Sequence, residues 1–190
     1  MDPLAIIQKY YPVESEAYNI LVKHSRSVAD KALLIGRAHP ELQLDLQFVE
    51  EAAMLHDIGA FYCHAPEIGC HGEAHYVCHG YLGAELLRKE GYPRHALVCE
   101  RHTGTGITLE MIERHHLPLP YRDMCPQSME EQLICFADKF FSKTKPDGEK
   151  PVHRIIQSMA KYGIESVLQF ERWCDLFYQV NQHNHNSDNQ

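Results

Sequence analysis

Apolar residues recur at helical spacing along almost the whole chain. From Ser15 to Ala38 they stand three and four positions apart, and Gly36 and Pro40 mark the end of this predicted helix. Asp45 is placed to cap a second helix, whose apolar positions continue to His56 and which stops at Gly59. The same spacing predicts further helices over residues 77–90, 93–102 and 109–115.

The second half of the chain continues this pattern. Ser128 and Glu131 form a capping box that opens a helix reaching Phe141, and two more helices are predicted over 151–162 and 165–181. The segments 61–76 and 117–126 are rich in turn-forming residues and are predicted to be loops. No stretch alternates convincingly between polar and apolar residues, so the fold class is all-α. We expect one domain over 1–182, followed by a disordered polar tail over 183–190.

Composition limits the partners and the compartment. The net charge of −8 argues against an extended basic face for duplex nucleic acid. No apolar run is long enough to cross a membrane, and the N-terminus lacks a secretory signal, so we expect a cytoplasmic protein. The seven cysteines are an odd number without a CxxC pair, which argues against both a disulfide framework and a thiolate zinc site. For the oligomeric state, we keep a homodimer as one candidate.

Histidine is unusually frequent, with 14 copies, and several copies stand where a solvent-exposed side chain is not expected. His24 lies on an apolar helix stripe, His56 and Asp57 are adjacent at a helix end, and Asp138 lies within an apolar run. A buried aspartate is costly unless something pairs with it, and a divalent transition metal bound by imidazole and carboxylate would pair with all of these groups. Each residue alone also has a plainer explanation, as a hydrogen-bonded core histidine or one half of an ion pair.

Further histidines supply additional candidate ligands. His79 begins one predicted helix and His102 ends the next. His71, His75 and His79 follow one another at intervals of four residues, so spacing alone makes His75 as good a ligand as His79.

The order His…His-Asp…His…His…Asp resembles that of the HD-domain superfamily of metal-dependent phosphohydrolases, and Leu55-His56-Asp57-Ile58-Gly59 is similar to its HDIG subgroup. Segments around His24, His79, His102 and Asp138 carry the same resemblance, which covers about residues 20–145. The resemblance implies a helical bundle with a central metal site and selects His79 as the ligand rather than His71 or His75. It implies two divalent ions of iron, manganese, zinc, cobalt or nickel. His24, His56, Asp57 and Asp138 would hold the first, and Asp57, His79 and His102 the second.

A phosphate bound at this site needs cations besides the metals. Lys139 beside Asp138, Arg101 beside His102, and Lys143 one turn further are the candidates, and Thr103 offers a hydroxyl. Asp57, Lys139 and Arg101 are the predicted catalytic residues. Many HD proteins carry a basic residue shortly after the His-Asp pair, but here Gly59-Ala60-Phe61 follows.

The function implied is therefore hydrolysis of a phosphomonoester, a nucleotide or a dinucleotide phosphate, and we expect the substrate to be a small phosphorylated molecule, with a nucleotide favoured. Some HD proteins with the same ligand types hold a mixed-valent di-iron centre and oxidise a C–H bond with O2, which is one alternative. A non-catalytic nucleotide-binding module is another. We also expect Arg114, His116, Tyr121 and Arg122 to lie near the substrate, because their segment borders a ligand helix.

Overall fold

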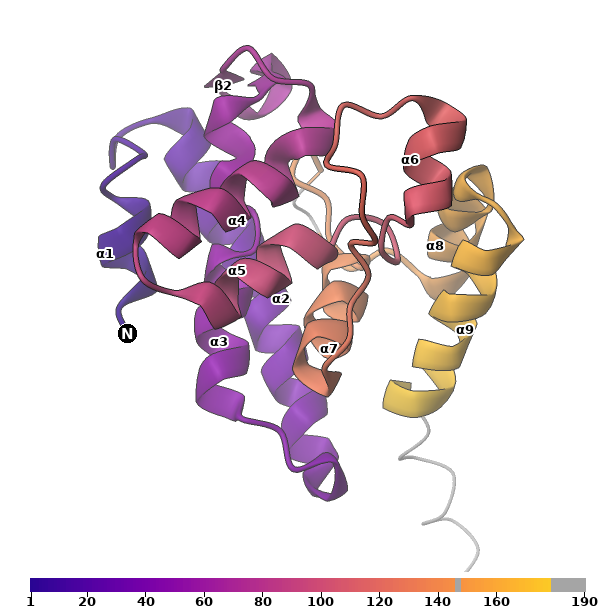
Figure 1. The fold of residues 1–190 in the computed structure, drawn as a ribbon. Coiled ribbons are helices and arrows are strands. Elements are labelled where there is room, and N and C mark those ends of the chain that lie inside the picture. The colour runs from indigo at the N-terminus through magenta and orange to yellow at the C-terminus, as the bar shows by residue number, and fades with distance from the viewer. Residues whose placement is uncertain (146–147, 179–190) are drawn as a thin grey trace, which may run out of the picture.

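Helices carry most of the regular structure in residues 1–145 and 148–178, which are the residues described by the computed structural model. The α-helices are α1 Pro3–Ile7, α2 Glu16–Ala38, α3 Leu46–Leu55, α4 His79–Lys89, α5 Pro93–Arg101, α6 Leu109–His115, α7 Met129–Asp138, α8 Val152–Met159 and α9 Ile164–Tyr178 (Figure 1). Short 3-10 turns are η1 Pro40–Leu42, η2 Ile58–Tyr62, η3 Pro66–Ile68, η4 Tyr76–Cys78 and η5 Ala160–Tyr162. The predicted all-α class is confirmed.

Side-chain caps fix the starts of the main helices. Ser15 Oγ accepts from the Tyr18 N–H at 3.1 Å, and Asp45 Oδ1 accepts from the Phe48 N–H at 3.0 Å. Ser128 Oγ accepts from the Glu131 N–H at 3.2 Å, as the predicted capping box requires. Glu131 returns its bond to the Gln127 N–H, at 2.9 Å, rather than to Ser128, so the box is shifted by one residue.

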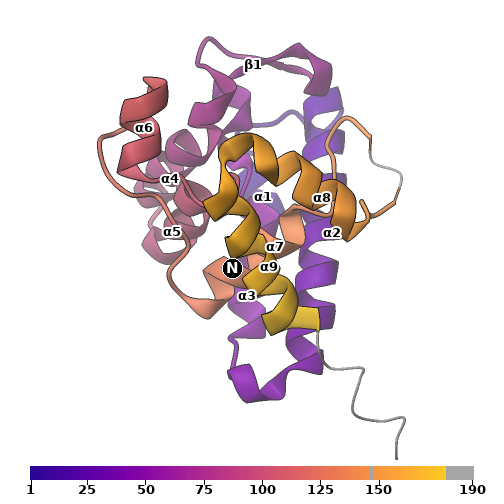
Figure 2. The ribbon, with the colours of Figure 1, turned by 90° about the vertical axis from the view of Figure 1, so that its right-hand side faces the viewer.

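Two buried apolar clusters hold the helices together. The larger joins α2, α3 and α7 to α8 and α9, with Phe136, Phe170 and Trp173 at its centre. The second lies between α1, α4, α5 and the segment after α3. The helix α9 packs on α7, and α8 packs on α9; Figure 2 shows both α8 and α9 facing the viewer, on the side of the molecule away from α4. The His56-Asp57 pair lies between Leu55 and Ile58 of the second cluster, so it is buried where the two clusters meet.

The structure differs from the predicted elements in four places. The helix α1, capped by Asp2, was not predicted, because five residues are too few for a periodic pattern. Two strands, β1 His64–Ala65 and β2 Cys70–His71, form an antiparallel pair, and each is too short to show alternation. The helices α3 and α7 end at Leu55 and Asp138, earlier than predicted. The predicted tail over 183–190, and the end of the last predicted helix, lie outside the described residues.

No helix in the described part of the chain has the length and apolar character needed to span a membrane.

Candidate metal centre

Six predicted ligands from five separate parts of the chain meet at one point. His24 comes from the middle of α2, His56 and Asp57 directly follow α3, and His79 opens α4. His102 caps the C-terminus of α5, and Asp138 ends α7. Their ligand atoms form two groups, one of His24, His56, Asp57 and Asp138 and the other of Asp57, His79 and His102, each with all its atoms within 4.8 Å of one another.

Asp57 divides its two carboxylate oxygens between the groups. Its Oδ2 lies 3.2 Å from His24 Nε2 and 3.0 Å from His56 Nε2. Its Oδ1 lies 3.2 Å from His79 Nε2 and 3.3 Å from His102 Nε2. A carboxylate with one oxygen facing each set of ligands has the arrangement of a bridge between two ions.

Asp138 completes the first group. Its Oδ1 lies 3.0 Å from His24 Nε2 and 3.5 Å from His56 Nε2. Ligand atoms about 2 Å from a common ion stand about 3 Å from one another, so the spacing in both groups is that of a coordination shell.

Backbone hydrogen bonds set the tautomer of three of the histidines. The Nδ1 atoms of His56, His79 and His102 lie 2.6, 2.7 and 2.8 Å from the carbonyl oxygens of Ala53, Tyr76 and Cys99. A carbonyl only accepts, so each of these three Nδ1 atoms carries a proton, and each ring turns its Nε2 towards the centre. These three histidines are therefore oriented to bind metal through Nε2, whereas Nδ1 of His24 is buried without a hydrogen-bond partner in the part of the chain that the structure describes.

These lone pairs face other acceptors. His79 Nε2 lies 3.0 Å from His102 Nε2, and both face Asp57 Oδ1. Within the described residues, His56 Nε2 and Asp57 Oδ1 are buried without a hydrogen-bond partner, while Asp57 Oδ2 has the Lys143 ammonium at 2.7 Å. Buried acceptors without a donor are costly, and a cation between them removes the cost. The six side chains fit a pair of divalent ions.

Electrostatics keep the carboxylates ionised. Burial opposes ionisation of Asp57, but His56 and Lys143 outweigh it and hold the pKa of Asp57 well below its usual range. Burial lowers the pKa of His102 to about 4, which keeps that ring neutral. For His56, burial also acts to lower the pKa, but the adjacent Asp57 outweighs it and raises the pKa to about 9, so a proton competes with a metal ion for this ring.

Two glycines allow the ligand-bearing segments to approach. A Cβ on Gly59 would lie 2.2 Å from the carbonyl oxygen of His79, and one on Gly80 would lie 2.5 Å from that of Cys99. The turn after Asp57 therefore lies directly on the start of α4, which in turn lies directly on α5. This close contact brings His79 and His102 to Asp57.

The predicted cations are placed very differently. Lys143 Nζ lies 2.7 Å from Asp57 Oδ2, at the centre itself. Lys139 is buried, and its Nζ donates to Asp138 Oδ2 at 2.7 Å and to the carbonyl oxygen of His102 at 3.0 Å. Arg101 pairs instead with Glu131 at 3.0 Å, and its contact with a substrate stays a prediction.

The other predicted substrate contacts lie further out. Thr103 lines a cavity that also touches His79. Arg122 binds the buried carboxylate of Glu100, while Arg114, His116 and Tyr121 are exposed. Sequence reasoning missed Tyr76, whose ring stacks on His79 with centroids 4.6 Å apart. An aromatic residue three positions before a ligand carries no distinctive signal.

Comparison with known proteins agrees with this geometry. The HD domain profile matches residues 21–143, which contain all six ligands. The chain belongs to the HD domain family. Among its relatives is an uncharacterized protein of Methanocaldococcus jannaschii, 34% identical over 128 residues that cover 66% of this chain and 68% of the relative.

Two further relatives of the HD chain bear the name tRNA (cytidine(56)-2'-O)-methyltransferase. That of Thermoplasma volcanium is 28% identical over 80% of this chain, and that of Picrophilus torridus is 31% identical over 70% of it. The matched regions cover only 40% and 38% of these two proteins. No solved structure gave a significant match to the chain.

Proposed function

We propose that this HD protein is a metal-dependent phosphohydrolase that uses a dinuclear centre to hydrolyse a small phosphate ester. The observation that carries the proposal is the position of Asp57, which presents one oxygen to each of two histidine-containing groups. Two bound ions would supply a water of lowered pKa and a Lewis acid for the phosphate oxygens.

The protein's own side chains would hold and orient the phosphate. Lys143 contacts the carboxylate shared by the two groups, and Asp57 raises the pKa of Lys143 against the effect of burial, so Lys143 is charged at neutral pH. We assign to Lys143 the stabilisation of charge on the phosphate oxygens, a task for which the segment after His56-Asp57 offers no basic residue. Lys139 would position Asp138 and the end of α5 rather than touch the substrate, because its contacts are with Asp138 and His102.

The space beside the centre supports a small substrate. A cavity of about 150 Å³ is lined by His24 and Lys143 together with Lys23, Asn19 and Ser142. The two lysines on its wall suit a phosphate group, and its size suits a small molecule better than a polymer. The names of the two methyltransferase relatives associate this kind of sequence with tRNA modification, which supports a nucleotide as the natural ester. The seven cysteines are free thiols, which supports a reducing, cytoplasmic location.

The proposal is tested by loading the protein with Mn²⁺, Co²⁺ or Fe²⁺ and measuring phosphate release from a panel of nucleoside monophosphates, nucleoside triphosphates and p-nitrophenyl phosphate. We expect metal-dependent release that is abolished in Asp57→Asn and retained in His71→Ala, since His71 is exposed on β2. A mixed-valent iron spectrum that changes on adding an organic substrate, without phosphate release, would instead favour the oxygenase. Tight binding without turnover would favour a non-catalytic module.

A further inference from the structure

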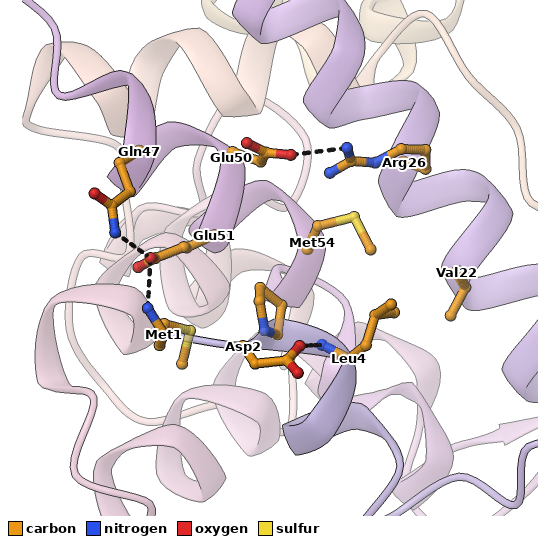
Figure 3. Close-up of a pocket in the computed structure, with 10 residues that line it drawn as sticks. Met1, Asp2, Leu4, Val22, Arg26, Gln47, Glu50, Glu51 and Met54 are labelled. Atoms are coloured by element: carbon orange, nitrogen blue, oxygen red, sulfur yellow. Dashed lines mark hydrogen bonds and ion pairs between the residues drawn. The ribbon is translucent and has the colours of Figure 1, made fainter.

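Two cavities in the described residues have a volume of about 540 Å³ each. One lies between α1, α2 and α3, and its charged groups already pair with one another (Figure 3). The Met1 amino group lies 2.6 Å from Glu51, and Arg26 lies 2.8 Å from Glu50. None of the residues lining this cavity is one of the six ligands, so it offers no link to the metal centre.

The other cavity adjoins the metal centre. His79 and Thr103 line it, and so does Tyr76, whose ring lies between His79 and Lys143. Lys143 Nζ is 5.8 Å from the centre of that ring, while His79 stacks against it. If a phosphate ester is bound at the metal centre, its organic group therefore lies next to this cavity.

The remaining walls are mostly apolar. Ile107 and Met111 lie on the α6 side, and Leu117 follows that helix. The volume falls within the range of about 300–1,000 Å³ that is usual for small-molecule sites. Apolar walls that also carry polar side chains suit a ring system with polar atoms better than they suit a bare alkyl chain. The polar side chains here include Thr103, Thr105, Ser166, His75 and His115.

The outer wall comes from outside the part of the chain that matches the HD domain. Lys161 and Tyr162 of η5 and Ser166 of α9 line the cavity, yet the HD domain match ends at residue 143. Tyr162 is 56% exposed, so its ring is not needed to fill the core. An aromatic ring that borders a cavity without being packed offers a face on which another flat ring can stack.

We propose that this cavity, named here the Tyr162 cavity, binds the organic part of the substrate, and that this part carries an aromatic ring of about the size of a nucleobase. This inference rests on the proposed phosphohydrolase function. The phosphate would bind at the metal centre, and the ring would stack on Tyr162. The C-terminal helices would then determine which phosphate ester the metal centre hydrolyses.

The experiment uses adenosine, which carries the ring but no phosphate, and measures its equilibrium binding to the full chain by isothermal titration calorimetry. We expect Tyr162→Ala to weaken adenosine binding about tenfold through loss of stacking. Met111→Trp, which would fill the cavity from the opposite wall, should abolish it. The matched control is Tyr62→Ala, since Tyr62 is 39% exposed and is not among the residues lining the cavity.

Kinetics of the metal-loaded protein provide the second measurement. For adenosine monophosphate, Tyr162→Ala should raise KM about tenfold with kcat little changed. For ribose 5-phosphate, which lacks the base, the same variant should behave as wild type.

The two proposals fail separately. If no ester is hydrolysed but adenosine binds and Tyr162→Ala weakens that binding, the phosphohydrolase proposal is wrong and the Tyr162 cavity stands as a ring-binding site. If esters are hydrolysed but adenosine does not bind, or Tyr162→Ala and Tyr62→Ala give equal values, the cavity proposal is overturned while the centre's function stands. Absence of both binding and hydrolysis overturns both.

Discussion

Replacing His79 by alanine should remove one metal ion and leave the other. The second group has three ligands, and without His79 only Asp57 and His102 remain, while the first group keeps all four of its ligands. Loss of a residue that merely supports a ligand already costs about 10–100-fold in metal affinity, so loss of the ligand itself should cost at least about 100-fold. The metal content should fall from two ions per chain to one, and kcat/KM for a phosphate ester should fall at least about 100-fold.

The variant should still fold. His79 is buried and stacks on Tyr76, so its removal should cost about 1–3 kcal/mol, less than the stability of a typical domain. Metal content is measured by mass spectrometry after loading and desalting, and folding by circular dichroism. The matched control is His75→Ala, because His75 is exposed and lies four residues before His79. If His75→Ala lost an ion and His79→Ala retained both, the division of the ligands into two groups would be refuted.

Three further substitutions test the surroundings of the centre. Lys143→Ala should lower kcat/KM for a phosphate ester about 100-fold with both ions retained. Lys145→Ala, which changes an exposed lysine two residues away, should leave kcat/KM unchanged. Equal activity in the two variants would show that Lys143 takes no part in the mechanism. Arg101→Ala should lower the free energy of unfolding by roughly 2–4 kcal/mol in urea titrations, because the substitution leaves the buried carboxylate of Glu131 without its guanidinium partner. A large rise in KM with unchanged stability would instead show that Arg101 contacts the substrate. Gly59→Ala should lower the melting temperature by several degrees in calorimetry, because the added Cβ would collide with the carbonyl oxygen of His79. An unchanged melting temperature would show that the backbones at Gly59 and His79 are not in tight contact.

The six clustered side chains could be singled out as candidate ligands from the sequence because they break local rules. His24 on an apolar stripe and Asp138 in an apolar run need partners, and the family resemblance identified His79 among three equally spaced histidines. The structure brings all six predicted side chains together. The main helices could be predicted for a related reason, since their caps at Asp45 and Ser128 are encoded within three residues.

The environment of the ligands could not be predicted in the same way. Whether Arg101 meets a substrate or Glu131 depends on how α5 packs against the start of α7, a contact across 30 residues. Gly59 was interpreted as a helix stop, whereas its lack of a side chain lets α4 lie on the turn after Asp57. The wall formed by Tyr162 depends on where η5 lies relative to α6, and no local pattern encodes that position.

The central claim is that two ions held by six ligands hydrolyse a phosphate ester. It is tested most directly by titrating the chelator-treated protein with Mn²⁺ while following bound metal and phosphate release together. We predict that release requires added metal and that both binding and release saturate at two ions per chain. Phosphate release that persists in excess chelator, or two tightly bound ions with no release from any ester of the panel, would contradict the claim.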